Sequence, residues 1–202
     1  MKNKKYEIRS FGGQAAPTIE GRTIEGYAIV FNKRSEVMLD WSADHGWRKF
    51  VEVIDPSALR SEDLLQYDIR ALVEHNRERL LARSNKGKGS LELTVDEHGL
   101  HYRFEAPNTA DGDYAVEMVG RGDISGSSFA FRARDDEWRK EGDTWVRTVK
   151  SFSALRDVTI TTDPAYTETE VSVRSLDEKD KSLNPIEDTA YIYEIEKLRN
   201  LI

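Results

Sequence analysis

Four histidines and the absence of cysteine narrow the chemistry open to this chain of 202 residues. Without cysteine, disulfides, thiolate zinc sites and cysteine nucleophiles are all excluded. The histidines are His45, His75, His98 and His101. His75 directly follows an apolar, strand-like run in ALVEHNRERLL, so a rigid element would hold it while it stays open to substrate. These are the requirements of a general base, although an ordinary histidine at a strand edge fits the same position.

The other three histidines fit a solvated surface better. His98 and His101 flank a turn in DEHGLHYRF. A strand pair would place them on opposite faces, which argues against a metal site. His45 lies in the polar stretch WSADHGW. A metal-dependent hydrolase that uses His98, His101 and nearby carboxylates is therefore the weaker alternative, and we expect neither a metal nor a cofactor.

Three serines are candidates for a nucleophile. Ser125, Ser127 and Ser128 lie in GDISGSSFAF, at a glycine-rich entry into an aromatic strand. Small residues allow the close backbone approach that a nucleophile and an oxyanion-binding amide both require. Glycine and serine clusters are also common in ordinary turns, so this pattern needs a nearby base to become informative.

An acid that could orient the base is Asp157, in ALRDVTITTDP. Acidic residues are depleted from strand interiors, so Asp157 either lies on a solvated face or is paired inside. The run at residues 135–143 differs, because five acids and two bases in DDEWRKEGD indicate an exposed hairpin tip.

The elements that would position these residues are mainly strands. Runs of β-branched and aromatic residues, or alternation of apolar and polar residues, predict strands at residues 23–31, 49–54, 69–74, 90–95, 100–105, 127–134, 144–149, 154–161 and, closing the set, 171–174. Two helices are predicted, one after Asp55-Pro56-Ser57 and one over residues 109–120. Short strands with few crossover helices favour a mainly β member of the α+β class, an antiparallel barrel flanked by a few helices.

Composition limits the partners. A net charge of −7 argues against non-specific binding of nucleic acid, and 38% hydrophobic residues is too many for wholesale disorder. No apolar run approaches the roughly 20 residues that span a bilayer, and no apolar segment follows the basic residues at the start. We therefore expect a soluble, unexported protein with no membrane contact.

Taken in order, several segments resemble one family. ALVEHN, the hairpin ending in EHGLHYRF, RGDISGSSFAFR and ALRDVTITTDPAYTETEVSVRS are together similar to the tailed-bacteriophage prohead maturation proteases. Those enzymes are similar in fold to the herpesvirus assemblins. The resemblance covers residues 23–174, and its specificity lies in the order of the segments, with the histidine about fifty residues before the serine.

The resemblance assigns roles position by position. It makes His75 the general base and Ser128, which is followed by Phe129-Ala130-Phe131, the nucleophile. Ser127 is the alternative and Ser125 a distant third. Asp157 stands where the family commonly has glutamate, and its side chain is one methylene shorter, which bears on its reach to His75.

The oxyanion donors differ from those of the assemblins. Where assemblins carry an arginine pair, this chain has Ala165 and Tyr166. Backbone amides near Ser128 are then expected to serve in their place.

The family implies a serine endopeptidase. It would cleave scaffold and major capsid protein segments, and also itself, inside the immature capsid in the host bacterial cytoplasm. Self-association is a further expectation. The alternative is a catalytically inactive β-barrel module that binds capsid or scaffold.

Composition also divides the chain. We expect an N-terminal arm at residues 1–22, the protease domain at 23–174, a charged linker at 175–186 and an amphipathic helix at 187–202. That helix would dock the protein to scaffold or coat assemblies, mediate self-association or be removed by the enzyme itself.

Overall fold

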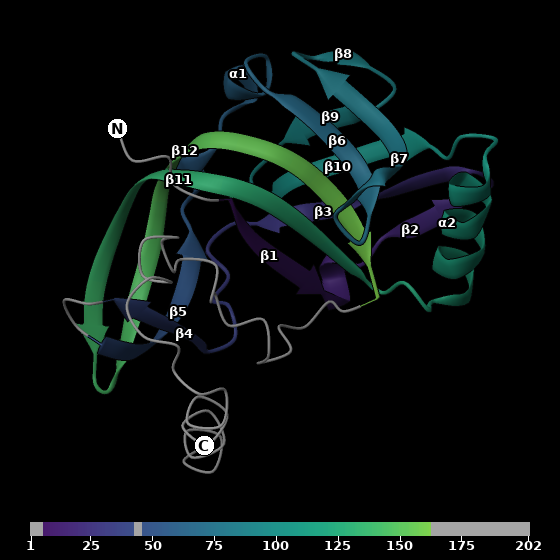
Figure 1. Cartoon of the computed structure of the whole chain (residues 1–202). Helices are drawn as coiled ribbons and strands as arrows, with labels where there is room; N and C mark the ends of the chain where they lie inside the picture. Colours follow the sequence, from purple (N-terminus) through teal and green to yellow (C-terminus); the bar gives the residue numbers. More distant parts are fainter. Residues whose placement is uncertain (1–5, 43–45, 163–202) are drawn as a thin grey trace, which may run out of the picture. The chain divides into compact units, whose positions relative to one another are not determined.

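Strands form most of the computed structural model, which describes residues 6–42 and 46–162 (Figure 1). The larger sheet has eight strands. Six of them follow one another in the order β1 (Glu7–Gly12), β11 (Gly126–Glu141), β12 (Thr144–Thr161), β6 (Asp68–Val73), β7 (Asn76–Asn85) and β8 (Lys88–Gly89). The remaining two are β5 (Gly46–Ile54), which pairs with β12, and β4 (Met38–Ser42), which pairs with β5.

The second sheet has four strands and is antiparallel throughout. Its order is β2 (Thr18–Glu20), β3 (Thr23–Val30), β10 (Gly99–Glu105) and β9 (Glu92–Val95). Side chains from both sheets join one buried hydrophobic cluster, to which Ile24 and Tyr102 contribute from this sheet and Phe129 and Phe131 from the larger one. Burying a side chain of this size contributes about 1.5–3 kcal/mol, so this cluster fixes β11 and its neighbours firmly.

The mainly β class is confirmed, but the sheets do not form the expected antiparallel barrel. β12 runs parallel to both β5 and β6. β5 and β6 follow one another along the side of β12 opposite β11, and residues 55–67 join them. Over the described residues each sheet also has free end strands, β1 and β8 in one case and β2 and β9 in the other.

The two predicted helices have different outcomes. The helix expected after Asp55 is divided into η2 (Pro56–Ala58) and α1 (Ser61–Leu64), because Leu59 between them is extended and buried in the core. The second is present as α2 (Ala110–Arg121), and the Thr109 side chain accepts a hydrogen bond from the amide of Gly112, 3.2 Å away. Gly122, with φ of 79°, ends it in the left-handed conformation that glycine adopts without strain.

The predicted hairpin tip at residues 135–143 is largely strand. β11 continues to Glu141 and the turn itself is formed by Gly142 and Asp143. β12 likewise joins the two strands predicted at 144–149 and 154–161 into one of 18 residues. Register shifts along the β11–β12 pair absorb the irregular stretch between the two predicted strands.

The first strand lies within the segment expected to be an N-terminal arm. β1 pairs with β11 from Glu7 opposite Phe131 to Gly12 opposite Gly126. Part of the expected arm is therefore a strand of the larger sheet. His45, the predicted strand at 171–174, the linker and the C-terminal helix lie outside the described residues. In the part of the chain that is described, no helix has the length and apolarity to cross a membrane.

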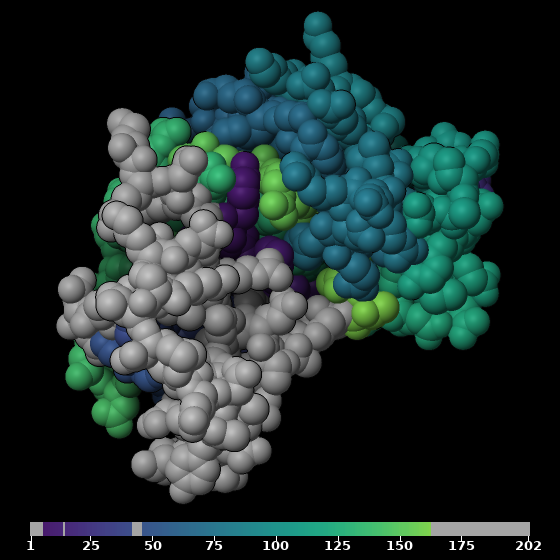
Figure 2. All heavy atoms as spheres, viewed as in Figure 1, coloured from purple at the N-terminus to yellow at the C-terminus, as the bar shows by residue number. Residues whose placement is uncertain are grey.

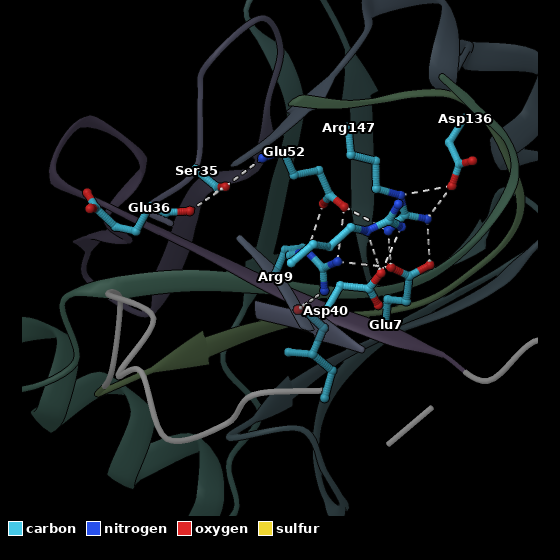
Figure 3. A network of polar contacts seen from close by, with 10 residues as sticks. Glu7, Arg9, Ser35, Glu36, Asp40, Glu52, Asp136 and Arg147 are labelled. Atoms are coloured by element: carbon cyan, nitrogen blue, oxygen red, sulfur yellow. Dashed lines mark hydrogen bonds and ion pairs between the residues drawn. The ribbon is translucent and has the colours of Figure 1, made fainter. Parts of the chain in front are cut away.

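A buried network of ion pairs connects β1 to three other strands (Figure 3). Glu52 on β5 accepts from Arg9 Nε at 2.7 Å and from Arg147 Nη1 at 2.8 Å, and its side chain is only 2% exposed. Glu7 contacts both arginines, and Asp136 on β11 accepts from Arg147 Nε at 2.8 Å. Burial would lower the pKa of Arg147, but the surrounding carboxylates raise it, so its charge is permanent.

Glu52→Gln is expected to destabilise the fold by about 3 kcal/mol, because it leaves two buried guanidinium groups facing a neutral amide. For a chain of this size that lowers Tm by about 6–12 °C, which calorimetry or thermal circular dichroism measures. The matched control is Glu92→Gln, which breaks an exposed pair with Arg103 at 3.8 Å. That change should cost under about 0.5 kcal/mol. Equal losses in the two variants would contradict a structural role for the buried network.

Candidate active site

His75 lies in the two-residue turn that joins β6 to β7. Val73 and Asn76 are paired across this turn, and Glu74 and His75 between them have φ of 51° and 52°. Two successive residues with positive φ define the hairpin turn that usually takes Asn-Gly, so Glu-His is an unusual and strained choice. The turn is held from outside, because the Glu74 carboxylate accepts from Thr161 Oγ1 and from the Thr162 amide, each at 2.7 Å.

Ser127 and Ser128 point to opposite faces of β11, as successive strand residues must. Ser127 faces the core, where its Oγ lies 2.8 Å from Tyr102 Oη and donates to the carbonyl of Ala15 at 2.8 Å. Ser128 faces the turn, and its Oγ lies 2.6 Å from His75 Nε2. Ser125 precedes β11 and is partly exposed. The structure therefore brings Ser128, and not Ser127, to the histidine.

Asp157 on β12 lies on the other side of His75. Its Oδ1 is 2.6 Å from His75 Nδ1, and its side chain is fully buried. Burial by itself would raise the pKa of Asp157, but the hydrogen bond and charge of His75, followed by those of Arg156, outweigh it and hold this pKa below its usual range. The shorter aspartate thus reaches the imidazole directly.

The three side chains form one line of hydrogen bonds with defined polarity. An ionised carboxylate can only accept, so Nδ1 carries the proton donated to Asp157. In the neutral imidazole Nε2 is then the acceptor, and it faces the Ser128 hydroxyl. This arrangement can withdraw a proton from Ser128 and stabilise the resulting imidazolium.

The Ser128 oxygen is fully buried and surrounded. Besides His75, it lies 2.8 Å from the carbonyl oxygen of Arg9 and 3.1 Å from Ser10 Oγ, both on β1. Its single proton therefore has two acceptors, His75 Nε2 and the Arg9 carbonyl. A carbonyl carbon can reach this oxygen only by displacing one of the present neighbours, and β1 is the neighbour that lies at the end of the sheet.

Backbone amides near Ser128 were expected to bind an oxyanion. At this position β11 is paired on both sides, through Ser10 on β1 and Thr159 on β12. The backbone amides of β11 around Ser128 are therefore directed at β1 or at β12. One of them can bind an oxyanion only where the pairing between β1 and β11 is broken. Ala165 and Tyr166 lie outside the described residues.

His98 and His101 lie away from this line. Both rings pack edge-on against Tyr27, with centroid distances of 4.5 and 5.0 Å. Over residues 6–42 and 46–162, no cluster of three or more histidine, aspartate or glutamate side chains is placed to hold a metal ion.

Sequence reasoning missed several residues around the three. Thr159 Oγ1 donates to Asp157 Oδ1 at 3.2 Å, and Arg156 Nε donates to Oδ2 of the same carboxylate at 2.8 Å. The signal for Thr159 was its place two residues after Asp157 in a strand, which puts both on one face. Ser10 carried no signal, because its contact depends on a strand that the apolar pattern did not reveal.

One family model and one solved structure are similar to this chain. The family model described as caudovirus prohead serine protease matches residues 5–182. Among solved structures, the capsid assembly protease gp21 of bacteriophage T4 is similar at 11% identity, with a TM-score of 0.46, over 78% of this chain and 97% of that one. The curated proteins give no match. Since the family model covers most of the 202 residues, the chain belongs to the caudovirus prohead serine protease family.

Proposed function

We propose that this protein is a serine endopeptidase that cleaves scaffold and coat-protein segments, and its own chain, during maturation of a phage capsid. The observation that carries the proposal is His75 held between Ser128 and Asp157 at 2.6 Å on each side. Family membership supports the class of reaction and its setting inside the immature capsid.

In the proposed mechanism Ser128 Oγ attacks the carbonyl carbon of the scissile peptide bond. His75 Nε2 takes the hydroxyl proton and later gives it to the departing amine, while Asp157 keeps the other ring nitrogen as the donor. Water then attacks the acyl-enzyme with His75 again as base, and the Ser128 hydroxyl is restored. Before the first step, the substrate carbonyl replaces the contact that Ser128 makes with the Arg9 carbonyl.

A fluorophosphonate probe tests the chemistry without a known substrate. Trypsin cleaves after Arg121 and Arg132, so a single peptide, residues 122–132, carries all three candidate serines. Fragmentation of the labelled peptide should place the adduct on Ser128. Co-expression with the coat protein and scaffold of the same phage should give cleaved products of both.

Two results would contradict the proposal. Labelling at Ser125 or Ser127 would overturn the choice of nucleophile. The absence of both labelling and coat-protein cleavage would favour the inactive capsid-binding module.

A further inference from the structure

Arg156 is placed beside Asp157 by an irregularity in the sheet. In the β11–β12 register Ala130 pairs with Asp157 and Phe131 with Leu155, so Arg156 is an extra residue with no partner on β11. Leu155 and Val158 both belong to the hydrophobic core. The two residues between them, Arg156 and Asp157, therefore both face away from the core instead of alternating, which is how a bulge redirects a side chain.

The bulge gives the buried carboxylate a second cationic neighbour. Arg156 Nε donates to Asp157 Oδ2 at 2.8 Å, while Oδ1 is taken by His75 and Thr159. The Asp157 side chain is fully buried, whereas that of Arg156 is 24% exposed. Both carboxylate oxygens are thus satisfied, and the guanidinium fixes the plane in which Oδ1 meets the imidazole.

Arg156 is itself held in place from the first residues of the described chain. Its guanidinium lies over the ring of Tyr6, 4.7 Å from the centroid, and Arg132 lies over the same ring at 4.1 Å. In Figure 2, atoms of the N-terminal segment, drawn purple, appear at the surface beside the yellow-green atoms of the end of β12. A cation over an aromatic ring is stabilised by about 0.5–2 kcal/mol, which restricts the guanidinium further.

Other charged groups near the His75–Asp157 pair already have partners. Glu74, on the turn, accepts from Thr161 and Thr162. On β6, Arg70 stands opposite Asp157 in the register and donates to Asp68, and on β1 Arg9 pairs with Glu52 and Glu7. Within the described part of the chain, Arg156 is thus the cation besides His75 that contacts the Asp157 carboxylate.

We propose that Arg156 is a positioning residue, which orients Asp157 and, through it, sets the pH range over which His75 accepts the Ser128 proton. This inference rests on the proposed serine protease function. The positive charge of Arg156 partly offsets the carboxylate, so the imidazolium is less stabilised than it would be beside an isolated aspartate. Removing that charge should therefore favour the imidazolium over the neutral imidazole that acts as base.

The test compares Arg156→Met with Arg156→Lys across the pH profile of kcat/KM. Methionine removes both charge and donor, so the acid limb should move up by about half to one pH unit and the plateau should fall about tenfold. Lysine restores a charge and one donor, and should return the acid limb to the wild-type position. Arg132→Met is the matched control, because it loses the same ring contact and charge but does not touch Asp157.

A readout without substrate keeps this inference separate from the proposed function. The chain has four histidines, so the NMR titration of His75 can be assigned by comparison with His75→Gln. Its midpoint should move up in Arg156→Met and stay in place in Arg132→Met. An unchanged midpoint and acid limb in Arg156→Met would overturn the positioning role even if the wild-type enzyme cleaves. Failure of the wild-type protein to label or cleave would instead overturn the proposed function.

Discussion

Ser128→Ala should lower kcat/KM by about 10⁴-fold or more, because no other hydroxyl lies within reach of His75 Nε2 on the Ser128 face of β11 in the described residues. Ser10 Oγ touches the serine oxygen rather than the imidazole. The Ser128 hydroxyl that this variant removes makes three polar contacts. Its loss should change the free energy of unfolding by about 1 kcal/mol. Cleavage of coat protein and labelling by the probe should both disappear while the thermal transition remains cooperative.

The matched control is the same substitution one residue earlier. Ser127→Ala removes a buried hydroxyl that bridges Tyr102 and the Ala15 carbonyl, so it should cost about 1–3 kcal/mol of stability. At temperatures below the lowered Tm of this variant, kcat/KM should stay near the wild-type value. If Ser128→Ala still cleaves and Ser127→Ala does not, the nucleophile assignment is wrong.

Asp157→Asn should lower kcat by about 10³–10⁴-fold with little change in the positions of the side chains. The asparagine amide has nearly the same shape as the carboxylate but no charge. It neither secures the tautomer with the proton on Nδ1 nor stabilises the imidazolium that forms when Nε2 takes the serine proton. It also leaves Arg156 without its carboxylate partner. Steady-state kinetics on a coat-protein segment measures the loss.

Asp55→Asn is the control for Asp157→Asn, because the Asp55 carboxylate contacts neither His75 nor Ser128. Asp55 accepts from Lys150 at 2.8 Å and from the hydroxyl and amide of Ser57 at 2.6 and 2.9 Å, and these hydrogen bonds lower its pKa to about 2. Asparagine caps a helix about as well as aspartate, so the replacement should cost under about 1 kcal/mol, through the lost ion pair with Lys150, and leave kcat unchanged. An Asp157→Asn enzyme within tenfold of wild type would show that His75 works without a carboxylate.

Much of the candidate site was predictable from residue types and their order. His75 stood at the end of an apolar run, and the structure places it in the turn immediately after β6. Alternation along the β11 segment meant that Ser127 and Ser128 had to face opposite ways, although the pattern alone did not say which of them faced His75. Asp157 stood out as an acid within a strand, and its partner proved to be the imidazole.

The parts that could not be predicted depend on backbone geometry that leaves no compositional trace. Glu74 and His75 adopt positive φ without glycine or asparagine, because Thr161 and Thr162 hold the turn from another strand. Arg156 contacts Asp157 because of the bulge in β12. A bulge of one residue shifts which side chains face the core but requires no particular residue type, so composition does not reveal it.

The fold shows the same division. A run of β-branched and aromatic residues located β3, and alternation of apolar and polar residues located β9 and β10, each to within about two residues. β1 was missed, because Glu7 and Arg9 are charged and lie in the sheet only by virtue of carboxylates and guanidinium groups on distant strands. Interactions between residues as far apart as Glu7 and Arg147 cannot be inferred from local periodicity.

The contact between Ser10 and Ser128 has a consequence for the order of events during synthesis. The two residues are 118 positions apart, and Asp157 follows Ser128 by nearly thirty more. Such distant pairings form late, because a long loop must close before they contribute any stability. A nascent chain shorter than about 160 residues lacks the carboxylate and cannot complete the sheet around the serine. The three proposed catalytic side chains can therefore meet only after nearly the whole described fold has left the ribosome.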